Sequence, residues 1–370
     1  MKRLVYIGLF LFLLIVLSSS IGKLNMEDAT FTLTYGIDVN QNNELEFYAT
    51  SPVFGREIEV KKQILGVKSS TIRQSRKGFD QRSPGLSLGS KIQIILIGNK
   101  LLKDPNWFSL LDVFYRDFKG TVSPIVVVVD GPVSEIIYYT PKNQPRTTIF
   151  LKKLITTAKL RGETVNTNLQ ELHRQMYEKG ATPYLSNIKK NQKIILNGST
   201  LLTERGNYST GLTVQETALL QILQGQKANY SLTLPIFTKE HNDSIVKNRI
   251  SFTAQDIQTK IKTKYINGKF QFDIQVAMKM IVTEKLFPYD MRKNNKKLED
   301  MVEQQLKIKF QNVIKKIQKD ELDPIGLGLY ARAHQYKEFT CIQDTWGETL
   351  SKANINITIK LKTNSMGAIK

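Results

Sequence analysis

The chain has 370 residues, of which 41% are hydrophobic, 9% are aromatic and 23% are charged. This composition excludes an intrinsically disordered chain, and the length predicts two or three domains. Lysine and arginine total 53 against 33 aspartates and glutamates, so the net charge of +20 favours anionic surroundings without specifying which kind.

The first segment has the three parts of an export signal. Lys2 and Arg3 precede an unbroken apolar run over 4–17, and serines follow it at 18–20. The run is shorter than the roughly 20 apolar residues that span a bilayer comfortably. We therefore expect residues 1–20 to be a signal peptide or an N-terminal membrane anchor, in preference to a buried core helix.

The N-terminal region, 21–193, begins with strand patterns. Apolar residues alternate with polar ones over 31–38, which predicts a half-buried strand. A second strand is expected over 44–51, and the polar turn 40–43 between the two predicts a hairpin. The stretch 78–89 is rich in Gly, Ser, Arg and Asp, and we expect it to be a loop.

A β-α-β unit is expected next. Short continuous apolar runs at 92–97 and 125–129 flank a helical stretch around 105–118. Continuous apolar runs are typical of strands that are buried on both faces of a sheet. Two further helices are predicted, over 147–159 and 168–179.

The C-terminal region, 194–370, opens with a hairpin-like stretch at 194–203. Thr213 and Glu216 then have the spacing of a capping box, which predicts a helix that ends at Gly225. Whether the halves that meet near residue 195 share strands is left open.

The longest β signal of the chain follows. Strands are expected over 257–265 and 270–282, joined by Asn267-Gly268, a pair typical of type I′ turns. Apolar residues recur with a 3.6-residue period over 298–317, which predicts a long helix. The segment 354–362 alternates again and is expected to be a terminal strand.

A further helix is expected from Asp323 to Tyr336, with Asp323 as its N-cap and Pro324 as its first residue. Gly326 and Gly328 would lie inside it, where paired glycines favour close helix packing over phosphate binding. Strand runs and helix runs mix without a strict βα repeat. The predicted class is therefore α+β, with mixed and antiparallel sheets, flanking helices and two to three compact domains.

The sequence offers no catalytic constellation. His173, His241 and His334 are the only histidines and lie in unrelated segments, whereas a metal site or a triad needs several convergent partners. The single cysteine, Cys341, excludes an internal disulfide. No P-loop, Rossmann fingerprint or nucleophile elbow is present. We therefore predict a non-enzymatic protein without a cofactor or a metal.

Four segments, in the same order, resemble the Ger(x)C family of spore germination proteins. They are TYGID, LSLGSKIQIILIG, LTVQETALLQIL, and DPIGLGLYARAHQY with the tryptophan that follows it. The resemblance covers nearly the whole chain and is strongest near the C-terminus. The residues at the family's motif positions, which we take as candidate interaction residues, are Gly36, Asp38, Glu216, Asp323, Gly326, Gly328 and Trp346. Trp346 is expected to be a core or seam residue rather than a partner contact.

The resemblance implies an accessory C subunit of a nutrient germinant receptor that is required for spore germination. Such a subunit would be membrane-associated at the extracytoplasmic face of the spore inner membrane and would bind the polytopic A and B subunits. The export signal disfavours a nucleic-acid binder. The alternative is an exported small-ligand sensor or binding protein, with a pocket between the halves lined by exposed aromatics. An exported enzyme acting on an acidic wall polymer is least favoured, because no carboxylate pair stands out.

The chain departs from the family at the expected lipid attachment site. Family members are lipoproteins whose signal ends in a diacylated cysteine, and Ser20 stands near that position here. A serine hydroxyl cannot form the thioether to the lipid. We therefore expect the apolar segment to be retained as an anchor, with ordinary signal cleavage as the alternative, and lipidation is left open.

Overall fold

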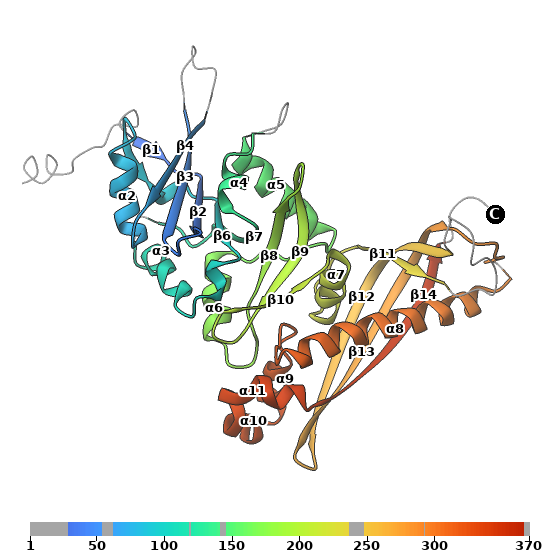
Figure 1. The fold of residues 1–370 in the computed structure, drawn as a ribbon. Coiled ribbons are helices and arrows are strands. Elements are labelled where there is room, and N and C mark those ends of the chain that lie inside the picture. The colour runs from blue at the N-terminus through green and yellow to red at the C-terminus, as the bar shows by residue number, and fades with distance from the viewer. Residues whose placement is uncertain are drawn as a thin grey trace, which may run out of the picture.

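The computed structural model describes residues 29–53, 62–117, 120–140, 146–236, 248–291 and 293–365. The expected signal or anchor at 1–20 lies outside these ranges. Sheets of two, eight and four strands form the described chain, and helices pack on the two larger sheets (Figure 1). The predicted α+β class with several mixed sheets is confirmed. None of the described helices is both long enough and apolar enough to cross a bilayer.

The eight-stranded sheet has the order β10-β9-β8-β7-β6-β2-β3-β4. Its four central strands, β8, β7, β6 and β2, are parallel, and antiparallel strands extend it on both sides. Its strands are β2 (Thr34–Val39), β3 (Leu45–Pro52), β4 (Lys62–Lys68), β6 (Ile94–Gly98), β7 (Ile125–Asp130), β8 (Tyr184–Lys190), β9 (Ile194–Leu202) and β10 (Tyr208–Leu212). A small parallel pair, β1 (Ala29–Phe31) and β5 (Leu86–Leu88), lies beside it.

Helices cover both faces of this sheet. Alternate residues of β6 and β7 enter two separate apolar clusters, so Ile95 and Ile97 belong to one cluster and Ile94 and Leu96 to the other. This two-sided burial explains the continuous apolar runs and confirms the β-α-β unit. The helices of the first face are α2 (Ile72–Asp80), α3 (Asp112–Arg116) and α6 (Leu169–Tyr177), and those of the second are α4 (Val133–Ile137) and α5 (Thr147–Leu160).

Three sequence expectations for this half need correction. The strand expected to be half-buried, β2, is buried on both faces because it lies between β6 and β3 under helices on either side. The expected loop 78–89 holds the end of α2 and all of β5, since Thr71 caps α2 and Phe79 anchors it in the core. The helical stretch near 105–118 is a 3₁₀ turn (Trp107–Leu111) that leads into the short α3.

The four-stranded sheet has the order β11-β12-β13-β14. The β12–β13 hairpin turns at Asn267 and Gly268, which both have positive φ, as the type I′ prediction requires. Strands β13 and β14 are parallel, and parallel neighbours need a long crossover, which four helices provide here. The strands are β11 (Tyr230–Pro235), β12 (Arg249–Ile266), β13 (Lys269–Lys285) and β14 (Asn354–Ser365), and the helices are α8 (Asn295–Lys319), α9 (Leu327–His334), α10 (Tyr336–Ile342) and α11 (Trp346–Ser351).

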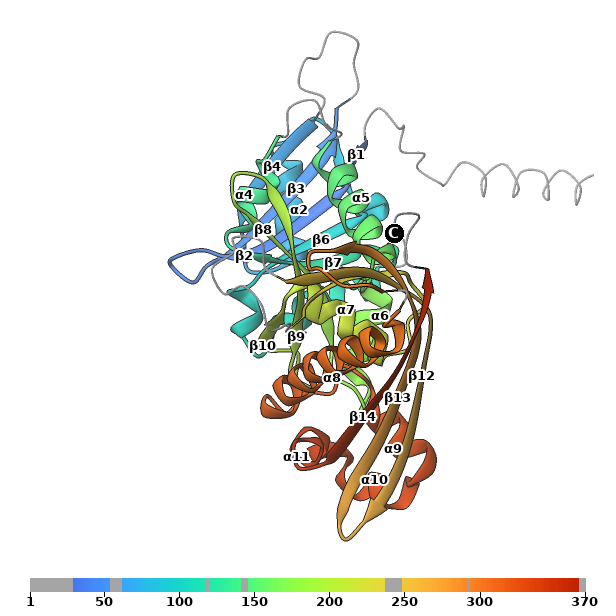
Figure 2. The same cartoon turned by 90° about the vertical axis from the view of Figure 1, so that its right-hand side faces the viewer.

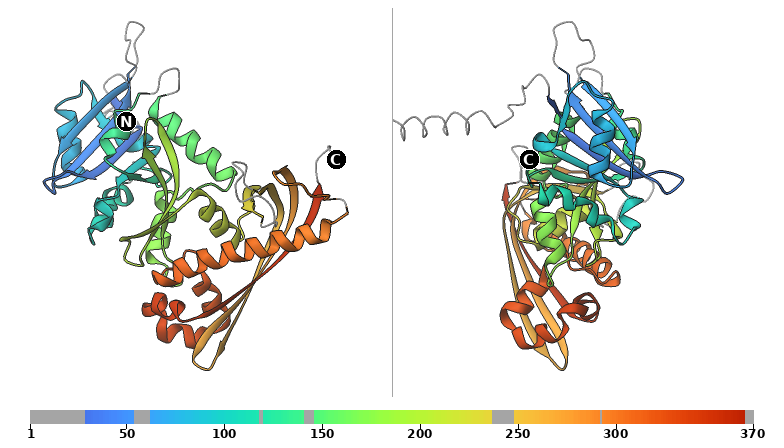
Figure 3. Two further views of the ribbon diagram at one scale, coloured as in Figure 1. Left: turned by 45° about the vertical axis from the view of Figure 1, so that its right-hand side comes forward. Right: turned by 90° about the vertical axis from the view of Figure 1, so that its left-hand side faces the viewer.

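One face of this sheet packs on helices and the other meets solvent. Every second residue of β13 from Phe270 to Val282 is buried, and α8 lies along that face (Figures 2 and 3). Helix α7 (Val214–Leu223) lies between the two large sheets (Figure 1) and is buried on nearly all sides. The boundary expected between residues 193 and 194 falls between β8 and β9, which pair within the eight-stranded sheet.

Glutamates from α8 cap the outer edge of β14. The Leu361 N–H donates to Glu303 Oε1 at 2.7 Å, and the Thr363 N–H donates to Glu299 Oε1 at 2.7 Å. Both backbone groups point away from β13 and would otherwise be unpaired at the sheet edge.

Candidate functional site

Four of the seven motif residues meet around one buried carboxylate. Asp323 Oδ1 accepts from the N–H groups of Gly326 at 2.8 Å and Leu327 at 3.0 Å. Asp323 Oδ2 accepts from the Gly328 N–H and from the Trp346 indole N–H, each at 2.8 Å. Asp323 is completely buried. Burial raises the pKa of this carboxyl, and the four hydrogen bonds act in the opposite direction.

The helix predicted from Asp323 to Tyr336 is wrong at both ends. Helix α9 begins at Leu327, after Gly326 with a left-handed φ of 84°, and the helix breaks at Gln335, where α10 takes over. Asp323 therefore binds the first N–H groups of α9 from outside the helix rather than as its N-cap. Residues 324–326 separate Asp323 from the first residue of α9. Asp323 can still bind the N–H groups of the helix because the Trp346 indole N–H fixes its carboxylate in place.

The same residues join the two halves of the molecule. The Thr182 N–H donates to the Asp323 carbonyl, and the Asp323 N–H donates to Thr182 Oγ1, both at 2.9 Å. Gly328 packs directly on Gly180, so that a Cβ at Gly328 would lie 2.6 Å from the Gly180 Cα. Thr182 and Gly180 precede β8 of the eight-stranded sheet. We call the set Asp323, Gly328, Trp346, Thr182 and Gly180 the interdomain junction.

Trp346 contributes packing as well as a hydrogen bond. It is 2% exposed, and its ring lies 5.4 Å from both Phe270 and Phe339, measured between ring centroids. The contact with Phe270 is edge-on and the contact with Phe339 is tilted, and both geometries are typical of aromatic cores. The expectation that Trp346 is a core residue is confirmed.

Gly36 and Asp38 lie elsewhere, where β2 meets the start of α4. Asp38 Oδ2 accepts from the Val133 N–H at 2.7 Å, and burial raises the pKa of the Asp38 carboxyl. A Cβ at Gly36 would lie 2.7 Å from Val133 Cγ1. Both residues therefore hold α4 against the sheet.

Glu216 completes the predicted capping box. The Thr213 N–H donates to Glu216 Oε2 at 2.8 Å, and the Glu216 N–H donates to Thr213 Oγ1 at 3.2 Å. Lys316 of α8 lies 3.3 Å from Glu216 Oε2 and donates to the Gly211 carbonyl at 2.6 Å. This cluster is a second link between the two halves, and it joins α8 to β10 of the eight-stranded sheet.

Replacing Thr213 by alanine is expected to lower the free energy of unfolding by about 1 kcal/mol, because the cap of α7 loses its acceptor. Thr213→Ser keeps the hydroxyl oxygen and should remain close to the native stability. Urea unfolding of the two variants beside the native chain measures the difference. An alanine variant as stable as the serine variant would show that the box contributes nothing.

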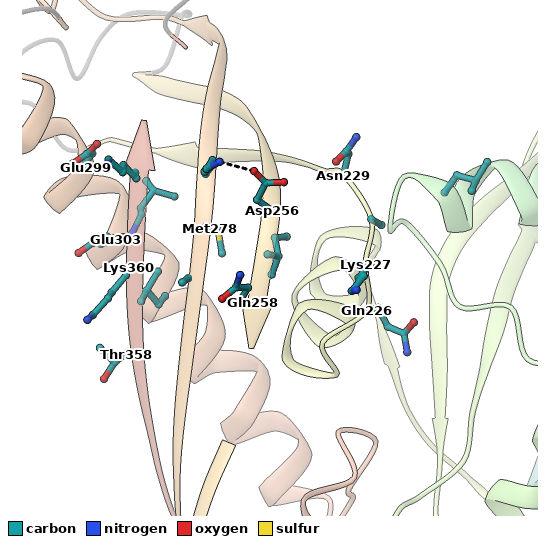
Figure 4. A pocket seen from close by; sticks show the side chains of 18 of the residues that line it. Gln226, Lys227, Asn229, Asp256, Gln258, Met278, Glu299, Glu303, Thr358 and Lys360 are labelled. Atoms are coloured by element: carbon teal, nitrogen blue, oxygen red, sulfur yellow. Dashed lines mark hydrogen bonds and ion pairs between the residues drawn. The ribbon is translucent and has the colours of Figure 1, made fainter. Parts of the chain in front are cut away.

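A large open hollow of about 1680 Å³ lies between the two halves. It extends from the end of α5 and the loop 226–229, over the irregular part of β12 near Asp256, and across β13 and β14 to α8 (Figure 4). Six lysines line it: Lys159, Lys227, Lys279, Lys296, Lys360 and Lys362.

The carboxylates of the hollow are engaged with other groups. Asp256 pairs with Lys279 at 2.8 Å, an ion pair drawn in Figure 4, while Glu299 and Glu303 accept the β14 N–H groups described above. None of the described residues that line the hollow is aromatic. The hollow between the halves is therefore not the expected pocket lined by exposed aromatics, and its lining combines six lysines with aliphatic and amide side chains.

The described histidines do not converge on a site. His173 packs among Tyr115, Tyr177 and Phe108 on the first sheet, and His334 lies at the end of α9. His241 lies outside the described residues. Across the described ranges, no three His, Cys, Asp or Glu side chains are grouped to hold a metal ion.

Comparison with known proteins gives two consecutive family matches and similar proteins. Residues 22–190 match the spore germination protein N-terminal domain, and residues 197–367 match the family described as spore germination B3/GerAC like, C-terminal. Spore germination protein B3 of Bacillus subtilis (strain 168) is 25% identical over 287 residues, which are 75% of this chain and 74% of that protein. The crystal structure of the GerBC protein has a TM-score of 0.57 at 18% identity, over 89% of this chain and 96% of that one, and shows the same fold.

Proposed function

The chain belongs to the Ger(x)C family of spore germination proteins, and from this membership we propose that it is the accessory C subunit of a nutrient germinant receptor. The proposed place of action is the outer face of the spore inner membrane. The proposed activity is binding to the polytopic A and B subunits, through which the subunit is required for germination.

The observation that carries this proposal is the use of the motif residues inside the protein. Asp323, Gly328 and Trp346 bind one another and the loop before β8, and Lys316, which pairs with Glu216, donates to the Gly211 carbonyl of β10. Residues engaged in this way fix the relative placement of two sheets. A rigid two-part body that presents its outer surfaces is what a scaffold subunit needs. For the same reason we propose that the protein works without catalysis.

A small-ligand sensor is less well supported. A small-molecule site encloses most of its ligand and is lined largely by apolar and aromatic side chains. The hollow between the halves is wide and open, six of its lining residues are lysines, and none of its described lining residues is aromatic. Such a surface fits an extended or bulky partner better than a single nutrient molecule.

Co-purification tests the proposal directly. A tagged A subunit is captured from a detergent extract of membranes that also contain the B subunit and this chain, with a tagged unrelated polytopic protein as the control. We expect this chain to elute with the A subunit and to be absent from the control. Equal recovery in both eluates would overturn the proposed role.

A further inference from the structure

The solvent face of the four-stranded sheet carries a regular array of lysines. Residues that pair directly across neighbouring strands share a face of the sheet. Lys260 pairs with Gln275, Ala277 with Lys360, and Lys279 with Lys362, and Gln275, Ala277 and Lys279 alternate along β13. All the lysines of these registers therefore point away from α8. The exposed lysines of this face, here called the basic face, are Lys260, Lys262, Lys264, Lys269, Lys279, Lys360 and Lys362.

Few carboxylates oppose these lysines. Asp273 is held by Asn356 and Gln271 through their side-chain amides, and Asp256 pairs with Lys279. Within the described residues the other six lysines of the face form no ion pair. Concentrated charge of one sign on an exposed surface attracts partners of the opposite sign.

The basic face continues into the hollow. Lys279, Lys360 and Lys362 belong to both, and the lining of the hollow adds Lys159 from α5 and Lys227 from the loop after α7. Lys227 and Lys360 lie on opposite sides of the hollow in Figure 4. Both added lysines are exposed and form no ion pair with a described residue. Positive charge therefore surrounds a concave space as well as covering a strand surface.

We propose that the basic face and the hollow together form the docking surface for an acidic polypeptide segment of a partner protein. This inference rests on the proposed function, since it names the surface through which a scaffold subunit would bind. The segment would lie across β12, β13 and β14 with its carboxylates on the lysines, and part of it would enter the hollow.

Two features favour a polypeptide over a lipid surface. Alternate lysines on one strand, such as Lys260, Lys262 and Lys264, lie about 7 Å apart, which is the spacing of alternate side chains in an extended peptide. The hollow is concave, with walls from both halves, and a planar bilayer cannot follow it. Its amides, among them Gln226, Asn229 and Gln258, can also bind peptide groups.

The test measures the binding of a fluorescent oligo-glutamate peptide to the full chain in neutral detergent, by fluorescence anisotropy. The test variant is Lys260→Glu/Lys262→Glu/Lys360→Glu. The matched control reverses three exposed lysines on other surfaces, Lys77→Glu/Lys103→Glu/Lys315→Glu, so both variants carry the same net charge. We expect binding that weakens as salt is added, a loss of about ten-fold or more in the test variant, and a much smaller loss in the control.

The remaining outcomes overturn the proposal in distinguishable ways. Equal losses in the two variants would mean that the peptide senses only net charge. If the peptide did not bind at all, the basic face would be a solvated surface without a partner. If only a soluble short-chain phosphatidylglycerol, added as a competitor, bound to the chain, the surface would be a lipid site. Both variants are then carried into the co-purification with the A subunit. If the native chain co-purifies and the test variant does so equally well, the proposed function stands and this docking surface falls.

Discussion

Asp323→Ala is expected to lower the free energy of unfolding by about 3–5 kcal/mol. The substitution leaves three backbone N–H groups and the Trp346 indole N–H without their acceptor in a fully buried place. Each buried donor without a partner costs about 1–3 kcal/mol, so the four donors together could cost more than the expected loss. We expect the structure around them to relax, or water to enter, and to restore part of the lost hydrogen bonding. Urea unfolding followed by tryptophan fluorescence measures the loss.

Asp323→Asn tests whether the charge or the shape of the side chain matters. The asparagine amide would point two N–H donors at a pair of donors, whichever way it is turned. We therefore expect this variant to lose at least about half of what Asp323→Ala loses. Asp344→Ala is the control, because Asp344 makes only an exposed ion pair with Lys179 and should change stability by less than about 1 kcal/mol. If Asp323→Ala also changed the free energy of unfolding by less than about 1 kcal/mol, the Asp323 carboxylate would not hold the interdomain junction together.

Gly328→Ala is expected to destabilise the chain by about 3 kcal/mol and to loosen the contact between its halves. The added Cβ would lie 2.6 Å from the Gly180 Cα and 2.7 Å from the Gly180 carbonyl oxygen. Both are backbone atoms, so no side-chain rotation can relieve the clash, and the loop before β8 must move away from α9. Faster proteolysis near Gly180, together with a lower urea midpoint, would report the movement.

Gly211→Ala is the matched control for this substitution. Gly211 lies in β10, has ordinary φ, and a Cβ there would meet only the Ser199 carbonyl oxygen at 3.9 Å. Its stability should stay within about 0.5 kcal/mol of the native chain. If Gly328→Ala behaved like this control, the close approach of Gly180 and Gly328 would not exist in solution.

Features set by local sequence were predictable. Asn267-Gly268 fixes its own turn, Thr213 and Glu216 cap a helix within four residues, and the runs at β6 and β7 require burial on both faces. The role of Asp323 was predicted wrongly, because an Asp-Pro pair is locally typical of a helix N-cap followed by the first helical residue. Its real partners include Trp346 and Thr182, far away in the chain, and no local pattern shows that they will converge.

The candidate docking surface was only partly visible in the sequence. The alternation of lysines in TKIKTK and TIKLK indicates one exposed, basic side on each strand. That the two sides coincide depends on β14 pairing in parallel with β13, which the crossover of four helices decides. The hollow could not be foreseen, because its lining comes from six separate segments of the chain.

The two glutamates on the edge of β14 affect how copies of the chain would interact when they lie close together. Proteins confined to a membrane meet one another far more often than proteins in free solution. A bare sheet edge under those conditions can template the addition of a neighbour's strand. Because Glu299 and Glu303 already occupy edge donors at Thr363 and Leu361, a neighbouring copy of this chain could not add a strand at β14 without first displacing them.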